Sequence, residues 1–237
     1  MPFGASRAGL MSVAEDDIPD SVESQWRREE FADPWPANVG DVDMSVSGLS
    51  KSTFSNGEDS VFGDGTDAHG LASGPETLAT NETFGIAFTI QYPNPDQFDT
   101  FFGCTGDGQF FIRDPSGSGT IEIALQDSNS NNLNVETDNQ YDDGNPHPII
   151  INKRGNSASD IGFYVDDMTT EQSTTINNDQ GFDHTNYNLS TDWAFWARNT
   201  DGTIDSNIEA DMGVIELNSN PYSEEEREEF VSRRPEV

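Results

Sequence analysis

The chain has 237 residues and a formal net charge of −33, because 44 acidic residues stand against 11 basic ones. It has no basic patch that could displace phosphate counterions, which argues against binding to nucleic acid or to an anionic membrane surface. Its single cysteine, Cys104, excludes an intramolecular disulfide and a cysteine-based zinc site. No apolar run approaches the ~20 residues of a membrane-spanning helix.

The acidic residues are scattered along the chain, and this distribution indicates a solvent condition rather than a basic partner. Charge on this scale repels itself in dilute buffer, whereas above ~1 M salt the Debye length falls to about 3 Å and screens most of the repulsion. The composition therefore predicts a protein that works in near-saturating salt, as haloarchaeal proteins do. A disordered acidic chain is the alternative, but 15 Phe, 4 Trp and 5 Tyr supply enough aromatic area for a core.

Residues 1–24 differ from the rest, because they are small and polar with isolated apolar positions. We expect an N-terminal arm over this range, which gains order against another surface. The segment before Glu15 lacks the continuous apolar stretch of a signal peptide, so export is not expected. The positions expected to make assembly contacts are Phe3, Arg7, Leu10, Met11 and Val13.

From residue 84 onwards, apolar residues alternate with small or polar ones over short runs separated by turn residues. This period of two predicts an all-β sandwich or barrel, with Lys153–Ser157 as a hairpin turn. Trp193 and Phe195 should share one strand face, and Trp196 should lie on the other. The expected strands cover residues 84–90, 121–125, 133–135, 149–151, 161–165, 193–196 and 208–214. The expected core includes Phe84, Phe88, Ile121, Ile123, Ile161, Phe163 and Met212.

One helix is expected, close to the C-terminus. Ser223 and Glu226 fit a capping box, and glutamates fill the first turn, where they favour the helix dipole. This short helix should pack on the β domain through Phe230.

The order of these features resembles the laminin-G-like branch of the concanavalin-type jelly rolls over about residues 40–230. A Gly/Asp-rich phrase stands at residues 62–67, ahead of the Phe-Thr-Ile-style strand at 84–90. A later strand ends in the turn Tyr164–Asp167, where Asp167 takes the place of the family's usual glycine.

Two further features of this resemblance lie near the C-terminus and are its most specific parts. Ile208–Leu217 is similar to the family's Ile-Asp-Glu-Val strand, and Tyr222–Glu226 is similar to its Leu-Ser-x-x-Glu helix start. The resemblance implies an antiparallel β-sandwich, a laminin-G-like jelly roll, over residues 25–237.

The N-terminal phrase is similar to the openings of virion proteins from haloarchaeal tailed viruses and their proviruses. The similar residues are Pro2–Leu10 and Ile18–Ser21. This resemblance implies a capsid decoration, turret or spike protein that is made in the host cytoplasm without a signal peptide and ends on the virion exterior. Its partners would be copies of itself and other virion proteins such as the capsid shell.

Jelly rolls of this type include glycosidases, so we compare the acidic residues of the last strand with the carboxylate pair that such enzymes need. Retaining enzymes need a nucleophile and an acid ~5.5 Å apart. Glu209 and Asp211 share a strand face, but the position where the third acid of the motif would stand is Val214. Glu216 falls on the opposite face unless a bulge intervenes near Gly213. The motif is therefore broken, and no catalytic residue is assigned.

Other site candidates are few. Asp64 and Asp67 lie in a Gly-rich loop and are weak candidate calcium ligands, because two aspartates in so acidic a chain are more typical of turn residues. No other cofactor is expected. Tyr141 and Tyr187 lie in polar loops rich in Asn and Asp, where an aromatic ring could stack on a sugar, so both are glycan-contact candidates.

These observations predict a non-enzymatic structural protein on the exterior of a haloarchaeal virus particle, with contact to host surface glycans as a second role. Two other classes stay open. One is a carbohydrate-binding module of a haloarchaeal surface protein, and the other is a glycoside hydrolase, which would need the paired carboxylates found broken above.

Overall fold

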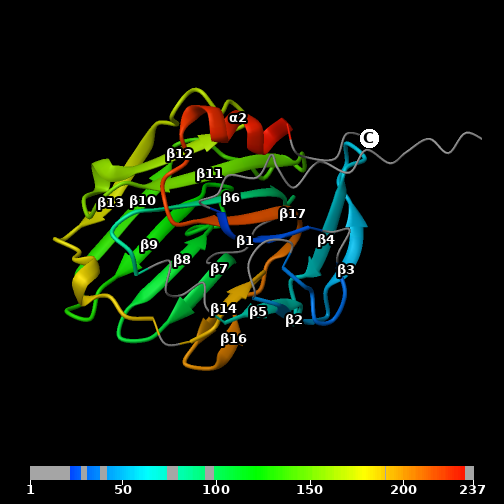
Figure 1. Ribbon diagram of the computed structural model, residues 1–237, viewed down its shortest axis with the longest axis horizontal. Helices are drawn as coiled ribbons and strands as arrows, with labels where there is room; N and C mark the ends of the chain where they lie inside the picture. Colours follow the sequence, from blue (N-terminus) through cyan, green and yellow to red (C-terminus); the bar gives the residue numbers. More distant parts are fainter. Residues whose placement is uncertain are drawn as a thin grey trace, which may run out of the picture.

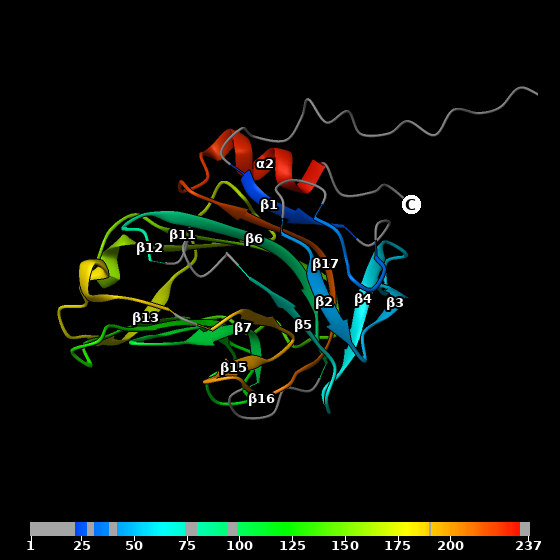
Figure 2. The same ribbon diagram turned by 60° about the horizontal axis from the view of Figure 1, so that its bottom comes forward.

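Alternating apolar residues bring two antiparallel sheets face to face, as Figures 1 and 2 show. The structure is a computed structural model that describes residues 22–27, 31–37, 42–73, 80–93, 99–189 and 191–232. Over these residues the predicted all-β sandwich is confirmed. No helix in these ranges is long and apolar enough to cross a membrane.

The first sheet has seven strands and contains most of the strands predicted near the C-terminus. They are β1 (Val22–Trp26), β3 (Ser50–Thr53), β4 (Asp59–Asp64), β6 (Phe84–Gln91), β11 (His147–Lys153), β12 (Ile161–Val165) and β17 (Glu209–Asn218). The order across the sheet is β12–β11–β6–β17–β4–β3, and β1 pairs with β17 beyond the end of β4. The predicted hairpin is confirmed, because β11 and β12 pair in register on either side of the turn.

The second sheet has ten strands, several of them too short to predict from alternation. They are β2 (Met44–Ser47), β5 (His69–Ala72), β7 (Thr100–Thr105), β8 (Gln109–Arg113), β9 (Glu122–Gln126), β10 (Asn132–Thr137), β13 (Thr174–Asp179), β14 (Trp193–Phe195), β15 (Arg198–Thr200) and β16 (Thr203–Asp205). The order is β13–β10–β9–β8–β7–β14–β5–β2. The hairpin β15–β16 joins this sheet through one parallel bridge between β15 and β7.

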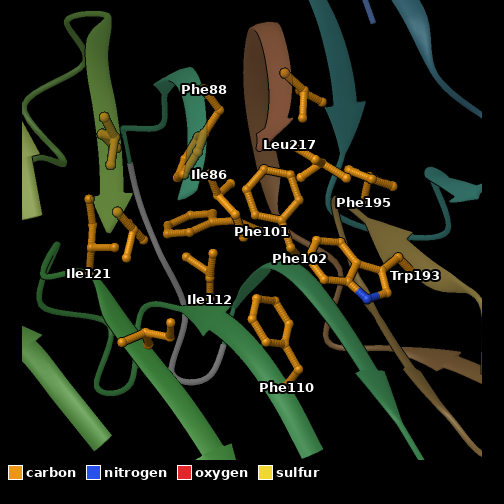
Figure 3. Close-up of a cluster of buried hydrophobic side chains, with 14 of the residues drawn as sticks. Ile86, Phe88, Phe101, Phe102, Phe110, Ile112, Ile121, Trp193, Phe195 and Leu217 are labelled. Atoms are coloured by element: carbon orange, nitrogen blue, oxygen red, sulfur yellow. The ribbon is translucent and has the colours of Figure 1, made fainter. Parts of the chain in front are cut away.

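Aromatic rings from the two sheets meet in the interior, where Figure 3 shows Phe88 opposite Phe102. Their ring centroids lie 4.7 Å apart in an edge-to-face arrangement, and Phe110 stacks on Trp193 at 4.5 Å. Such pairs add about 0.5–1.5 kcal/mol each beyond the burial of their area. The predicted core is confirmed, since each of its members is buried in one continuous cluster: Phe84, Phe88, Ile121, Ile123, Ile161, Phe163 and Met212.

The strand around Trp196 departs from the predicted alternation. Trp196 has a φ of 60°, which ends β14 and turns the indole into the core instead of onto the outer face. Its Nε1 donates to the carbonyl of Ala210 at 3.0 Å. Gly63 makes room for this ring, because a Cβ on Gly63 would lie 2.5 Å from the indole.

Helix α2 (Glu224–Ser232) covers the outer face of the seven-stranded sheet beside β11 and β12. The predicted capping box is present: the N–H of Ser223 donates to Glu226 at 2.7 Å, and the N–H of Glu226 donates to Ser223 Oγ at 3.3 Å. Phe230 is buried, as predicted. Arg227 lies over the ring of Tyr164, with its guanidinium carbon 3.7 Å from the ring centroid, and binds the helix to β12.

The first described residues of the chain overlap the predicted arm. Strand β1 begins at Val22, so residues 22–24 of the predicted arm pair with β17 in the sandwich. The predicted assembly residues lie outside the described residues: Phe3, Arg7, Leu10, Met11 and Val13.

Candidate binding cleft

A polar cleft of about 280 Å³ opens where three turns of the ten-stranded sheet meet. The turns are β7–β8, β9–β10 and β15–β16, which the fold brings together although they lie up to ninety-six residues apart. The bridge between β15 and β7 places the third turn beside the first. The lining residues are Thr105, Gly106, Asp107, Gly108, Gln109, Gln126, Asp127, Ser128, Ser130, Thr200 and Asp201.

The buried carboxylate of Asp127 holds the β9–β10 turn in shape. It accepts the N–H groups of Asn129 at 2.9 Å and Asn131 at 3.0 Å, and also the N–H of Asp183 at 3.2 Å. Burial acts to raise the pKa of Asp127, but the hydrogen bonds from Asn131, Asp183 and Asn129 outweigh it and hold the pKa below its ordinary value. Because its oxygens are occupied in this way, Asp127 shapes the wall of the cleft.

The β15–β16 turn is tied directly to the end of β7. The N–H of Asp201 donates to Thr105 Oγ1 at 3.0 Å, and that hydroxyl donates to the carbonyl of Asn199 at 3.3 Å. Asp201 itself has a φ of 51°, which leaves its side chain exposed at the rim. The Oγ1 of Thr200 is buried in the cleft lining and has no hydrogen-bond partner among the described residues.

The floor of the cleft rests on Tyr187. This ring is buried, and its hydroxyl donates to the carbonyl of Gln109 at 2.8 Å. A Cβ on Gly108 would lie 2.5 Å from the carbonyl oxygen of Gln126 and 2.7 Å from the Tyr187 ring, so the β7–β8 turn closes only over a glycine. The sequence predicts Tyr187 as a glycan contact in a polar loop, whereas the structure buries its ring beneath the β7–β8 turn.

A row of amide side chains leads from the cleft across the outer face of the sheet. Gln109 and Gln126 are paired in register, and Gln126 is paired with Asn132 on the next strand. Gln126 Nε2 donates to Asn132 Oδ1 at 3.0 Å, and Asn132 Nδ2 donates to Gln180 Oε1 at 3.1 Å. These side chains point away from the core because Phe110 and Leu125, the next residues along β8 and β9, point into it.

Two arginines lie on the same outer face, and both contact the ring of Phe111. Their guanidinium carbons are 5.8 Å (Arg113) and 5.7 Å (Arg198) from the ring centroid of Phe111. Arg113 donates twice to Glu122, at 2.7 and 2.9 Å, and Arg198 donates to both carboxylate oxygens of Asp205, at 2.5 and 3.2 Å. Both cations are therefore paired with carboxylates of the same sheet.

Tyr141, the other glycan candidate, lies on a different loop. Its side chain is buried, its hydroxyl donates to Gln172 Oε1 at 3.2 Å, and its ring packs edge-on against His147. It therefore offers no open ring face, because packing against its neighbours covers it. Polar neighbours in the sequence suggested exposure, but they do not reveal which loops pack on the sandwich.

The calcium candidates form a turn. Asp64 accepts the N–H groups of Thr66 at 3.0 Å and Asp67 at 3.4 Å, and the first of these bonds is the main cause that lowers the pKa of Asp64. Within the described ranges no group of three or more His, Cys, Asp or Glu side chains is placed to hold a metal ion.

The acids of β17 are placed by a bulge. Pairing with β6 shifts register between Met212 and Ile215, so Glu216 shares the outer face with Glu209 and Asp211. Glu216 is nevertheless buried and accepts Gln25 Nε2 at 2.5 Å, while Asp211 accepts Ser60 Oγ at 2.7 Å. The bulge that would place Glu216 on the same face as Glu209 is therefore present, but strand β1 covers Glu216.

A scan of protein-family models finds none that matches the chain, and a search of curated protein sequences finds no match either. Solved structures with the same fold are similar over most of the chain. The binding domain of botulinum neurotoxin serotype D in complex with N-acetylneuraminic acid has a TM-score of 0.64 at 16% identity, covering 91% of this chain and 51% of that one. The binding domain of Paraclostridial mosquitocidal protein 1 has a TM-score of 0.64 at 10% identity, covering 89% and 52%.

A third neighbour is the receptor-binding domain of a botulinum neurotoxin C/D mosaic serotype. Its TM-score is 0.61 at 14% identity, and the match covers 90% of this chain and 51% of that one. The chain thus spans about half the length of the solved structures that it matches. These likenesses show a shared jelly-roll-like sandwich, and the neighbours are receptor-binding or ligand-binding domains.

Proposed function

We propose that this chain is a non-enzymatic surface subunit of a haloarchaeal virus particle, whose cleft contacts host surface glycans. The observation that carries the glycan role is the polar cleft itself, which three turns build on a sandwich shared with receptor-binding domains. Amides, hydroxyls and carboxylates converge there, and these are the groups that hydrogen-bond to sugar hydroxyls. The amide row extends the same chemistry away from the cleft.

A binding role is favoured over catalysis by the state of the acids on β17. Glycoside hydrolysis needs two carboxyl groups that flank the scissile bond in an open site. Glu216 is buried against Gln25, and Asp211 is held by Ser60. This strand therefore offers no open carboxylate pair.

The particle context rests on the composition and on the N-terminal arm. Among the described residues only four acids are buried, so most of the negative charge lies on or near the surface, as suits molar salt. The arm would attach the sandwich to the capsid shell or to other copies through spaced apolar residues. Those residues are Phe3, Leu10, Met11 and Val13, with Arg7 among them.

Particle fractionation tests the context. Virus particles purified on a density gradient in molar salt should contain this chain by mass spectrometry, and antibodies should label it on intact particles. If the chain is found only in the envelope fraction of uninfected cells, the virion proposal is wrong and a carbohydrate-binding module of a cellular surface protein takes its place.

Glycan binding is tested separately, with purified protein in molar KCl on an array of neutral and acidic oligosaccharides. Gln109→Ala removes an exposed amide from the cleft and should weaken binding. Glu209→Gln is the matched control, since it changes an exposed side chain on the other sheet. Equal binding by both variants would show that the cleft is not the site.

A further inference from the structure

We infer that the cleft selects uncharged, hydroxyl-rich glycans and excludes glycans that carry carboxylate or sulfate groups. This inference rests on the proposed function and names the class of ligand for the same cleft. It is based on the charge of the side chains that line the cavity and on whether those side chains are free to bind a ligand.

The exposed charges of the cleft are all negative, although one oxygen of Asp201 also lies 3.4 Å from the hydroxyl of Thr105. Asp107 and Asp201 are exposed at the rim, whereas Asp127 is occupied by the N–H groups of its own turn and of Asp183. No Lys, Arg or His stands among the described residues that line the cavity. A ligand anion would therefore meet carboxylates without a cation to balance it.

The two arginines on this face of the sheet are already paired with carboxylates. Arg113 and Arg198 each make two hydrogen bonds to a carboxylate, and each also lies over the ring of Phe111. Recruiting either arginine to a ligand anion would leave Glu122 or Asp205 without its cation, so the exchange gains nothing. Breaking such a pair leaves an uncompensated charge, which is costly for Glu122 because it is buried.

The high salt of the proposed setting leaves direct contacts to discriminate between charged and neutral glycans. At ~1 M salt the Debye length is about 3 Å, so long-range repulsion is screened and discrimination must come from direct contacts. A carboxylate or sulfate lodged against Asp107 and Asp201 would lose water without gaining enough donors, and an unsatisfied polar group is expensive.

A neutral sugar fits the same groups. Its hydroxyls donate, and carboxylates accept through two oxygens, so Asp107 and Asp201 can each bind a pair of neighbouring hydroxyls. The Oγ1 of Thr200 is buried beneath the surface of the lining, so Thr200 shapes the cavity and the exposed carboxylates and hydroxyls meet the sugar. Ser128 and Ser130 line the opposite wall with hydroxyls that can donate or accept.

The probes are mannotriose and N-acetylchitotriose as neutral glycans, and trigalacturonate and a sulfated heparin disaccharide as anionic ones, all measured in molar KCl. Wild-type protein should bind at least one neutral probe about tenfold more tightly than either anionic probe. The double variant Asp107→Asn, Asp201→Asn should lose about tenfold of the neutral binding, because hydrogen bonds to charged acceptors are lost. Glu209→Gln is the control and should bind like wild type.

The outcomes separate the two proposals. Equal or tighter binding of the anionic probes by the wild-type protein would overturn the selectivity inferred here, and it would leave the glycan-binding function standing if Gln109→Ala weakens that binding. Unchanged neutral binding by a double variant that melts at the wild-type temperature would also overturn the inference. Binding of none of the four probes, nor of any member of the array, would overturn both.

Discussion

Four carboxylates are buried among the described residues, and each keeps hydrogen-bond partners in the interior: Asp114, Glu122, Asp127 and Glu216. Asp114 accepts the N–H groups of residues 116–119, yet its burial is the larger effect and raises its pKa. A chain with so many acids can therefore bury a few of them, provided that each one organises a turn or pairs across a strand.

His147 lies between two carboxylates at the start of β11. Its Nδ1 is 3.0 Å from Asp166 and its Nε2 is 3.0 Å from Asp143. Burial alone would lower the pKa of His147, but the hydrogen bonds and charges of Asp166 and Asp143 outweigh it and raise the pKa above 6.5. Both nitrogens face acceptors, so the charged imidazolium is the form that satisfies the site.

We predict that His147 makes stability depend on pH. Because its pKa is higher in the folded state, its contribution is complete below the unfolded value of ~6.5 and is lost as the pH rises through the folded pKa. The melting temperature of wild type should exceed that of His147→Gln at pH 5, and the gap should narrow above neutrality. In an Asp166→Asn background, the effect of His147→Gln on the melting temperature at pH 5 should be smaller. An effect of equal size at pH 5 and above neutrality would contradict the role given to His147.

Phe163 tests the shared core. It lies fully buried on β12, and Phe163→Asp would place an unpaired carboxylate among apolar side chains. We expect a loss of roughly 5 kcal/mol or more, comparable with the whole stability of a domain, so the variant should not fold. Phe163→Leu keeps the site apolar and should lose less than about 2 kcal/mol. A soluble Phe163→Asp protein that melts cooperatively would contradict the core.

At the scale of elements, short segments rely on side chains to fix their ends. The hairpin β15–β16 has three residues in each strand and is bound to β7 through Thr105 and Asn199. Helix α2 is held by Arg227, whose Nε donates to the carbonyl of Met168 at 2.7 Å and whose Nη1 donates to that of Tyr222 at 3.0 Å. Such anchors let small elements occupy one position on a large sheet.

The capping box of α2 makes a prediction with a control in the same helix. Ser223→Ala removes the acceptor for the N–H of Glu226 and should lower the free energy of unfolding by about 0.5–2 kcal/mol. Ser232→Ala makes the same change at the last residue of the helix, where the hydroxyl donates to the carbonyl of Glu229, and should cost less. Chemical denaturation in molar salt measures both, and equal losses would show that the cap contributes nothing.

At the scale of the whole molecule, the repulsion from a net charge of −33 opposes the stability that burial of one continuous core supplies. We predict that the melting temperature falls as KCl or NaCl is lowered from molar concentration to ~0.1 M, because unscreened repulsion between surface acids grows. Differential scanning calorimetry over this range is the measurement. A melting temperature that stays constant would remove the argument for a high-salt protein.

The arm gives the second prediction at this scale. Deleting residues 1–20 leaves β1 intact, since this strand begins at Val22, so the truncated chain should stay folded and soluble. If the arm attaches the protein to the capsid, the truncated chain should no longer be incorporated into virus particles. Incorporation at the wild-type level would place the attachment on the sandwich, and failure to fold would show that the arm belongs to the domain.

Local sequence patterns by themselves determined several strands and the C-terminal helix of this protein. Alternation with a period of two identified β6, β9 and the hairpin β11–β12, because every second residue of a strand lies on the same face and the face toward the core repeats large apolar side chains. The capping box located the start of α2 for a similarly local reason. Short strands such as β2 and β15 carry too few repeats for alternation to reveal them.

The cleft was decided by tertiary structure alone. The segments 105–109 and 126–130 read as ordinary turns, and nothing in the sequence shows that Asp201 would join them. That juxtaposition follows from the strand order, in which β15 returns to bridge with β7. The same long-range packing buries Tyr141 and Tyr187, because the cover over a loop comes from residues distant in the chain rather than from its polar neighbours.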